Sequence, residues 1–270
     1  MSREGEINLT EAREQTIILA VKAGDKLRNF FYGEFTQTQK SGVDFTTQAD
    51  KEADRFISEE LLRLFPQSKV LSEEAVEGDY SSLKYEENLW VVDPQDGTIN
   101  FSRGHENFAV SIALGRLGVS RLGIIHMPLR RETYWAQEDL PGAFRVLTNE
   151  PIRVSNTKSL REVLVAIDWP YDLEQRQEVL RWAACFAPYV RQIKSTGSAV
   201  CDLAMVAAGK IDIYVQLGTK PWDTAAGRLL VKKAGGEVTT PEGEECDMFN
   251  NRILATNGVL HKTALELINN

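Results

Sequence analysis

Cysteine and histidine are both scarce in this chain, with three residues of each among 270. The cysteines, Cys185, Cys201 and Cys246, lack the spacing of metal ligands, and their odd number does not suit a disulfide framework. We therefore expect reduced thiols in a cytoplasmic protein. The histidines are scattered along the chain, which argues against a zinc site and against a histidine-based nucleophilic triad.

Long apolar runs and an excess of basic residues are also missing. No stretch approaches the ~20 apolar residues that cross a membrane, and the opening segment Met-Ser-Arg-Glu-Gly-Glu is polar rather than signal-like. The formal net charge is −8 at pH 7. Such a surface repels a phosphate backbone, so we expect neither a membrane nor a nucleic-acid partner.

Residues 90–101 form the most informative segment, Trp-Val-Val-Asp-Pro-Gln-Asp-Gly-Thr-Ile-Asn-Phe. An apolar run predicts a buried strand, which Pro94 and Gly97 then break into a tight turn. Asp93 and Asp96 should therefore face a common space, in an arrangement that suits Mg²⁺. A helix beginning after Gly97 could hold a phosphate at its free N–H groups. These features predict metal-assisted attack on a phosphate ester, although the same residue types alone also suit a simple turn.

Two further acidic segments complete the pattern: Val70-Leu-Ser-Glu73-Glu74 and Pro221-Trp222-Asp223-Thr-Ala-Ala226-Gly227. In this order, with the segment at 90–101 between them, they resemble the inositol monophosphatase family of Mg²⁺-dependent, lithium-sensitive phosphatases. That family carries a Glu-Glu pair, then Asp-Pro-x-Asp-Gly-Thr, then a Trp-Asp segment. The resemblance covers roughly Thr10 to the C-terminus. Other parts of the chain that fit the same family are Lys40, Asp44–Asp50, Gly197-Ser198-Ala199 and Ala207–Tyr214.

The resemblance implies a site for two or three Mg²⁺ ions, with Li⁺ as an inhibitor. Glu73, Asp93 and the main-chain carbonyl of Gln95 would hold the first ion. Asp93, Asp96 and Asp223 would hold the second, near the leaving oxygen, and Glu73 with water would hold a weaker third. Taken alone, Asp223 is more typical of a helix N-cap.

The resemblance also implies a catalytic set of Thr98, Asp50 and Glu73. Thr98 would orient the attacking water, and Asp50 would polarise the Thr98 hydroxyl. Because a metal-bound water can have a pKa near ~7, no histidine base is required. The implied substrate contacts are Asp96, Gly97, Thr98, the Ala199 N–H, Gln216 and Asp223.

Two departures from the family pattern leave the substrate open. Gln95 stands where the family usually has an aliphatic residue, which makes the packing of the loop uncertain but keeps the carbonyl ligand. Gln216 stands where inositol-preferring members often have Glu, and a neutral amide can donate as well as accept. The leading substrate is a small polyol or sugar phosphate such as inositol 1-phosphate. Fructose 1,6-bisphosphate and 3′-phosphoadenosine 5′-phosphate are alternatives, and a non-catalytic or moonlighting regulator is an alternative of another class.

The order of the expected helices and strands predicts an α+β half at residues 1–150 and an α/β half at 151–270, with a boundary near Glu150-Pro151. The first half should hold two helices, 8–31 and 47–64, a polar loop at 33–43 and a mostly antiparallel sheet. The second half should alternate strands and helices. The resemblance implies a layered αβαβα sandwich with the active site between the halves, and a homodimer. The strands expected are 70–71, 89–92, 109–117, 121–126, 133–136, 163–167, 190–193, 211–215, one near 238 and 253–255, and the later helices are 174–186, 198–208, 222–234 and one from 259.

Overall fold

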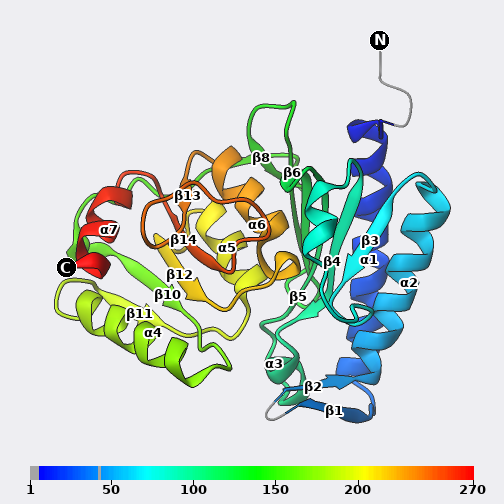
Figure 1. Ribbon diagram of the computed structural model, residues 1–270, viewed down its shortest axis with the longest axis horizontal. Helices are drawn as coiled ribbons and strands as arrows, with labels where there is room; N and C mark the ends of the chain where they lie inside the picture. Colours follow the sequence, from blue (N-terminus) through cyan, green and yellow to red (C-terminus); the bar gives the residue numbers. More distant parts are fainter. Residues whose placement is uncertain (1–5, 42–43) are drawn as a thin grey trace.

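The computed structural model describes residues 6–41 and 44–270. Five layers are stacked side by side (Figure 1). An outer pair of helices, α1 (Leu9–Phe31) and α2 (Gln48–Leu64), covers a seven-stranded sheet. The middle layer is α5 (Ala199–Ala207) and α6 (Pro221–Lys233). A five-stranded sheet and the outer helices α4 (Leu173–Phe186) and α7 (His261–Asn269) follow, which confirms the αβαβα sandwich.

The two sheets differ in strand direction, as the sequence predicts. The larger sheet has the order β3-β4-β5-β6-β7-β8-β9, and only the β3–β4 pair is parallel. The smaller has the order β11-β10-β12-β14-β13, with β10 parallel to both neighbours and the other pairs antiparallel. The strands are β3 (Lys69–Ser72), β4 (Leu89–Asp96), β5 (Ala109–Arg116), β6 (Val119–Met127), β7 (Glu132–Gln137), β8 (Ala143–Arg145), β9 (Pro151–Ile152), β10 (Leu164–Ile167), β11 (Gln192–Lys194), β12 (Ile213–Leu217), β13 (Glu237–Thr239) and β14 (Arg252–Thr256).

Capping residues fix where the first two helices begin. The Asn8 side chain accepts hydrogen bonds from the N–H groups of Thr10 and Glu11, so α1 begins where the sequence predicts. At α2, Thr47 and Asp50 form a reciprocal capping box. This box fixes Asp50 at the third residue of α2, with its carboxylate held at the helix N-terminus.

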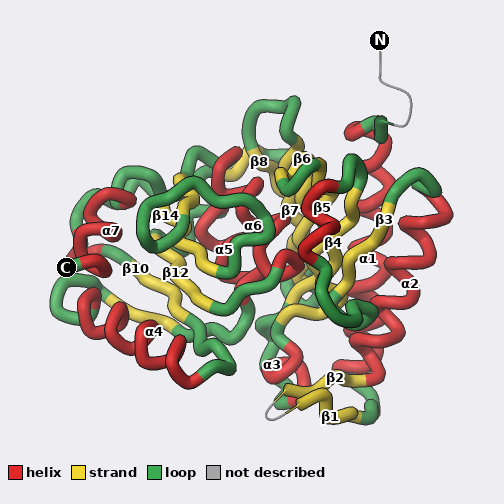
Figure 2. The backbone as a smooth tube through the Cα atoms, viewed as in Figure 1, coloured by secondary structure: helices red, strands yellow, loops and turns green. Residues whose placement is uncertain are grey.

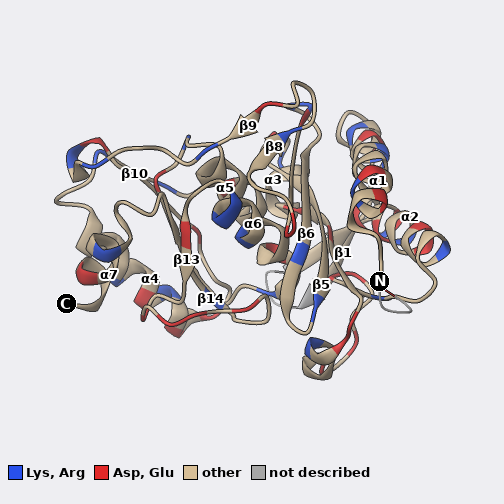
Figure 3. Ribbon diagram, turned by 90° about the horizontal axis from the view of Figure 1, so that it is seen from above, with Lys and Arg blue, Asp and Glu red and all other residues tan. Residues whose placement is uncertain are grey.

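The middle layer joins the two sheets into one core. Buried apolar side chains of the larger sheet, such as Val91, and of the smaller sheet, such as Tyr214, belong to one continuous cluster with Leu203 and Leu230 of α5 and α6. Figure 3 shows these two helices between the sheets, and charges of both signs on the outer helices. No helix within the described ranges combines the length and the apolar content needed to span a bilayer.

The loop expected at 33–43 is wrong for part of its length. Gln37–Ser41 (β1) pairs antiparallel with Asp44–Thr47 (β2), and this small hairpin lies beside the short helix α3 (Thr98–Ser102) (Figure 2). The segment QTQKS is polar on both faces, so it lacks the alternation that signals a strand. Gly42 and Val43, and the side chain of Lys40, lie outside the described residues. The structure also adds β1, β2, α3, β8, β9 and the 3₁₀ turns Ser81–Tyr85 and Leu160–Glu162 to the elements expected.

Candidate active site

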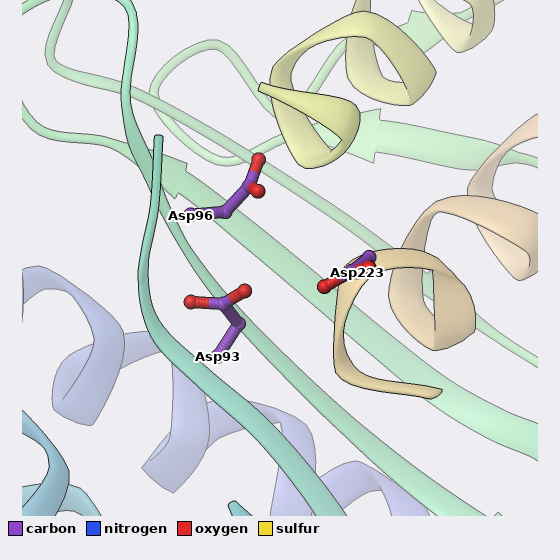
Figure 4. Close-up of side chains that lie close together, drawn as sticks. All are labelled: Asp93, Asp96 and Asp223. Carbon is purple, nitrogen blue, oxygen red and sulfur yellow. The ribbon is translucent and has the colours of Figure 1, made fainter. Parts of the chain in front are cut away.

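Three carboxylates from two distant parts of the chain converge between the larger sheet and the middle layer (Figure 4). Asp93 and Asp96 lie on β4, and Asp223 lies in the first turn of α6. One oxygen of each lies within 4.8 Å of the others, and Asp93 is buried while the other two are half-buried. Such a group of oxygen ligands can hold a divalent cation.

A bulge in β4 explains why both aspartates reach the same space. Asp93 pairs with Ser111 and Asp96 with Ala109 on β5, so β4 carries one extra residue between these pairs. Residues three apart in a regular strand point to opposite faces, and the extra residue brings them back to one face. Pro94 lies within the bulge, where its missing N–H costs no ladder hydrogen bond. The expectation that Pro94 ends the strand is therefore wrong, because β4 continues to Asp96.

Asp223 is oriented by the backbone at the start of α6. It is the third residue of the helix, and its Oδ2 accepts a hydrogen bond of 2.7 Å from the Lys220 N–H. The N-cap is Lys220, so the expectation of an Asp223 N-cap is wrong by three residues. Pro221 occupies the first helical position, where its fixed φ suits the helix.

Burial and mutual repulsion make this cluster costly without a cation. Burial chiefly raises the pKa of Asp93 well above its usual value, and the charges of Glu73, Asp96 and Asp223 add to the effect. Burial also raises the pKa of Asp96 to about 7, and it raises that of Asp223, where the charge of Asp96 follows. A divalent cation would offset both causes, so the donor set fits Mg²⁺.

Glu73 and Gln95 lie next to these three carboxylates. Glu73 follows β3, where its N–H donates to the Val92 carbonyl at 3.2 Å, and its charge acts on both Asp93 and Asp223. The Gln95 carbonyl accepts from the Thr98 hydroxyl at 3.3 Å. The Gln95 side chain is buried, and neither of its amide atoms has a hydrogen-bond partner in the part of the chain that the structure describes.

Thr98 and Asp50 meet although 48 residues separate them. The Thr98 hydroxyl donates to Asp50 Oδ1 at 3.1 Å, as an alternative to the Gln95 carbonyl. Asp50 also accepts from the N–H and the hydroxyl of Thr47, and burial, which outweighs these bonds, raises its pKa to about 6. Gly97 supplies the left-handed φ of +98° that starts α3, and an added Cβ there would lie 2.9 Å from the Asn107 carbonyl.

The far wall of this space comes from the second half of the chain. Ser198 caps α5, its hydroxyl donates to Asp96 Oδ2, and the Val200 N–H donates to the same oxygen at 2.8 Å. Ala199 is therefore the first residue of a helix that is tied directly to Asp96. Gln216 is buried on β12, and its Oε1 has no partner among the described residues. The Gly-Ser-Ala segment can be identified from the sequence, whereas the contact of Ser198 with Asp96 cannot.

Comparisons with known proteins match most of the chain to one family. A sequence model of the inositol monophosphatase family matches residues 8–270. The chain is 36% identical to a Thermotoga maritima protein named fructose-1,6-bisphosphatase/inositol-1-monophosphatase, over 86% of this chain and 85% of that protein. It is 33% identical to the inositol-1-monophosphatase of Bacillus subtilis, with 96% and 97% covered, and 36% identical to the Nus factor SuhB of Vibrio cholerae, with 81% and 80% covered.

Solved structures of similar proteins superpose on nearly the whole chain. The Thermotoga maritima IMPase superposes with a TM-score of 0.85 at 33% identity, covering 96% of this chain and 97% of that chain. A suhB protein from Bartonella henselae also gives 0.85 at 33% identity, with 94% and 96% covered.

Proposed function

The chain belongs to the inositol monophosphatase family and is a phosphatase, and from this premise we propose that it is a Mg²⁺-dependent phosphomonoesterase acting on a small polyol or sugar phosphate such as inositol 1-phosphate. One observation carries the proposal: Asp93, Asp96 and Asp223 converge within 4.8 Å from a strand and a helix that are far apart in sequence. Structural turns alone give no reason for three acidic groups to be buried against one another.

The proposed ligands are Glu73, Asp93, the Gln95 carbonyl, Asp96 and Asp223, for two or three Mg²⁺ ions. When bound, Mg²⁺ supplies charge neutralisation for the phosphate and lowers the pKa of a coordinated water. The protein in turn holds its carboxylates in place before the ion arrives, through the β4 bulge and the bond from Lys220 to Asp223.

Thr98 and Asp50 are proposed to orient the attacking water. With its own hydrogen directed to Asp50, the Thr98 oxygen presents its lone pairs to the site and can accept a hydrogen bond from that water. Glu73 is proposed to complete this catalytic set, and the N–H groups of Gly97 and Thr98 to bind the phosphate.

The alcohol part of the substrate is proposed to contact Asp96, the Ala199 N–H, Gln216 and Asp223. The neutral Gln216 keeps a second candidate open, a fructose-1,6-bisphosphatase or 3′-phosphoadenosine-5′-phosphate phosphatase. The double name of the Thermotoga maritima relative supports the first of these. A buried amide can pair with a donor or an acceptor, so it discriminates less strongly than a carboxylate against such substrates.

The test is phosphate release with and without Mg²⁺ from inositol 1-phosphate, fructose 1,6-bisphosphate and 3′-phosphoadenosine 5′-phosphate. We expect turnover only with Mg²⁺, inhibition by millimolar-range Li⁺, and loss of turnover in Asp93→Asn. Full activity of that variant would refute the metal site. A preference for inositol 1-phosphate would refute the second candidate.

A regulatory role is the alternative of another class, supported by the relatives named Nus factor SuhB. Such a role requires a stoichiometric protein partner that survives the loss of catalysis. Purifying tagged wild type and Asp93→Asn side by side tests it. The same partner retained by both would favour regulation, whereas only the self-association expected of a homodimer would count against it.

A further inference from the structure

A pair of buried aspartates, Asp168 and Asp202, lies near the three carboxylates of the candidate site, at the turn that precedes α5. Asp168 follows β10, and its Oδ1 accepts from the Ser195 hydroxyl at 3.2 Å, the Thr196 N–H at 3.0 Å and the Gly197 N–H at 2.8 Å. Asp202, in α5, accepts from the Thr196 hydroxyl at 2.8 Å through its Oδ1. One oxygen of each carboxyl group is thus occupied by donors from the same turn.

The other oxygen of each carboxyl group is left without a donor from the described residues. Asp168 Oδ2 and Asp202 Oδ2 are both buried, and no described residue donates a hydrogen bond to either. Burial chiefly raises the pKa of Asp202, and the neighbouring carboxyl group of Asp168 raises it further. Two neighbouring carboxylates that are both ionised repel strongly in a buried setting, whereas one proton shared between them satisfies both oxygens.

The turn is also held from the other half of the fold. The Asn100 and Asn107 side-chain amides donate to the Thr196 carbonyl at 2.8 and 3.2 Å. Gly197 has φ +75°, and a Cβ built there would lie 3.0 Å from the Asn100 amide nitrogen. Residues 195–197 are therefore clamped between α3 on one side and the acidic pair on the other.

We propose that Asp168 and Asp202 share one proton and act together as a positioning pair, which fixes the turn 195–197 so that Ser198 and Ala199 face the alcohol part of the substrate. The part of this inference that concerns substrate rests on the proposed function. Asp168 directly follows Ile167, which pairs with Val215 on β12, so Asp168 and Gln216 lie at the same end of these two strands. The positioning pair therefore connects both parts of the substrate wall that come from the second half of the chain.

The shared proton has a test that needs no enzyme activity. In Asp168→Asn, or in Asp202→Asn, the new amide N–H replaces the shared proton and donates to the remaining carboxylate. In the double variant two amide donors face each other without an acceptor. We expect each single variant to unfold within about 2 °C of wild type, and the double variant to lose at least about 3 °C beyond the sum of the singles, which corresponds to roughly 1 kcal/mol for a chain of this size. Additive changes in Tm would overturn the shared proton.

The positioning role is tested with two substrates. Asp168→Ala removes the acceptor for three donors of the turn, so we expect KM for inositol 1-phosphate to rise at least about tenfold, as the loss of one aligned hydrogen bond of ~1.4 kcal/mol would give. For p-nitrophenyl phosphate, which lacks a polyol, KM should rise by a clearly smaller factor than for inositol 1-phosphate, and Asp168→Asn should restore KM for inositol 1-phosphate. An equal loss on both substrates, or no rescue by Asn, would overturn it.

A matched control separates positioning from general destabilisation. Asp212 is also buried, and it anchors Ser155 and the Leu164 N–H at the opposite end of β10 and β12. Asp212→Ala should lower Tm without raising KM; a matching rise in KM would count against a specific role for Asp168. If wild type hydrolyses neither substrate, the proposed function fails, while the Tm comparison of the Asn variants still decides the shared proton.

Discussion

Burying the side-chain amide of Gln95 costs free energy, and the proposed role of this residue uses only its main-chain carbonyl. Its amide is buried, and both polar atoms lack partners within the described residues. A buried polar group without a hydrogen bond costs ~1–3 kcal/mol, and an aliphatic side chain of similar size avoids that cost. We expect Gln95→Leu to raise the free energy of unfolding in urea by about this amount and to keep Mg²⁺-dependent phosphate release. A less stable variant would mean that the amide is satisfied in solution.

Asp93 should link stability to metal binding. Burial and three neighbouring carboxylates raise its pKa, so its charged form is destabilising when no cation is bound. We expect Asp93→Asn to unfold at a higher temperature than wild type in chelator. Added Mg²⁺ should raise the Tm of wild type, because it binds the folded state, but not that of the variant. An equal Mg²⁺-dependent rise in both proteins would remove Asp93 from the ligand set.

Short segments allowed part of the site to be predicted. Asp93, Asp96 and Gly97 lie within five residues, so a local pattern identifies them, whereas the Asp223 contribution came from the resemblance. The pairing of Asp168 with Asp202 depends on the position of β10 against α5, which no local pattern encodes. The proposed roles of Thr98, Asp50 and Glu73 stay predictions until activity is measured.

At the scale of elements, the contact between α1 and β6 should make stability depend on pH. His126 is buried on β6 against Gly24 of α1, where an added Cβ would lie 2.3 Å from the imidazole ring. Burial lowers the pKa of His126 to about 4, while the charges of Asp25 and Arg28 oppose each other. The unfolded chain, with an ordinary histidine pKa of ~6.5, therefore binds a proton first as the pH falls.

The folded protein should therefore become less stable as the pH falls. The contribution of His126 is complete above pH ~6.5, and about 3 kcal/mol of the free energy of unfolding is lost as the pH falls toward ~4. Urea unfolding of wild type and His126→Gln across this range isolates the effect, because acidic groups contribute to both proteins. Parallel pH profiles would show that His126 is protonated or exposed in the folded protein.

Helices were easier to predict than short strands. The starts of α1 and α2 depend on Asn8 and Thr47, whose side chains bond to backbone groups two or three residues away. By contrast, β8 and β9 contain three and two residues, too few to show a period. They are strands because β7 offers an edge to β8, and β8 in turn offers an edge to β9, which is information from the tertiary fold.

At the scale of the whole molecule, the halves proposed at 1–150 and 151–270 meet in a shared middle layer. The cluster around α5 and α6 takes side chains from both sheets, while separate outer clusters lie beneath α1 and α2 and beneath α4 and α7. Each outer cluster contains a fully buried tryptophan, Trp90 in the first and Trp182 in the second. These residues can report on the two ends of the stack independently.

We expect the five layers to unfold in one transition, because exposing either face of the middle layer removes part of the core from the other half. Variants that retain only Trp90 or only Trp182, with the other tryptophans replaced by Phe, should give the same guanidinium midpoint by fluorescence. An earlier loss of the Trp182 signal would mean that α4 and its sheet unfold while the larger sheet persists. If α6 unfolded in the same step, the proposed metal ligands would separate, because Asp223 lies in α6 and Asp93 in the larger sheet. Adding Mg²⁺ should then bring the two midpoints back together, because the ion binds only when the middle layer and the larger sheet are both folded.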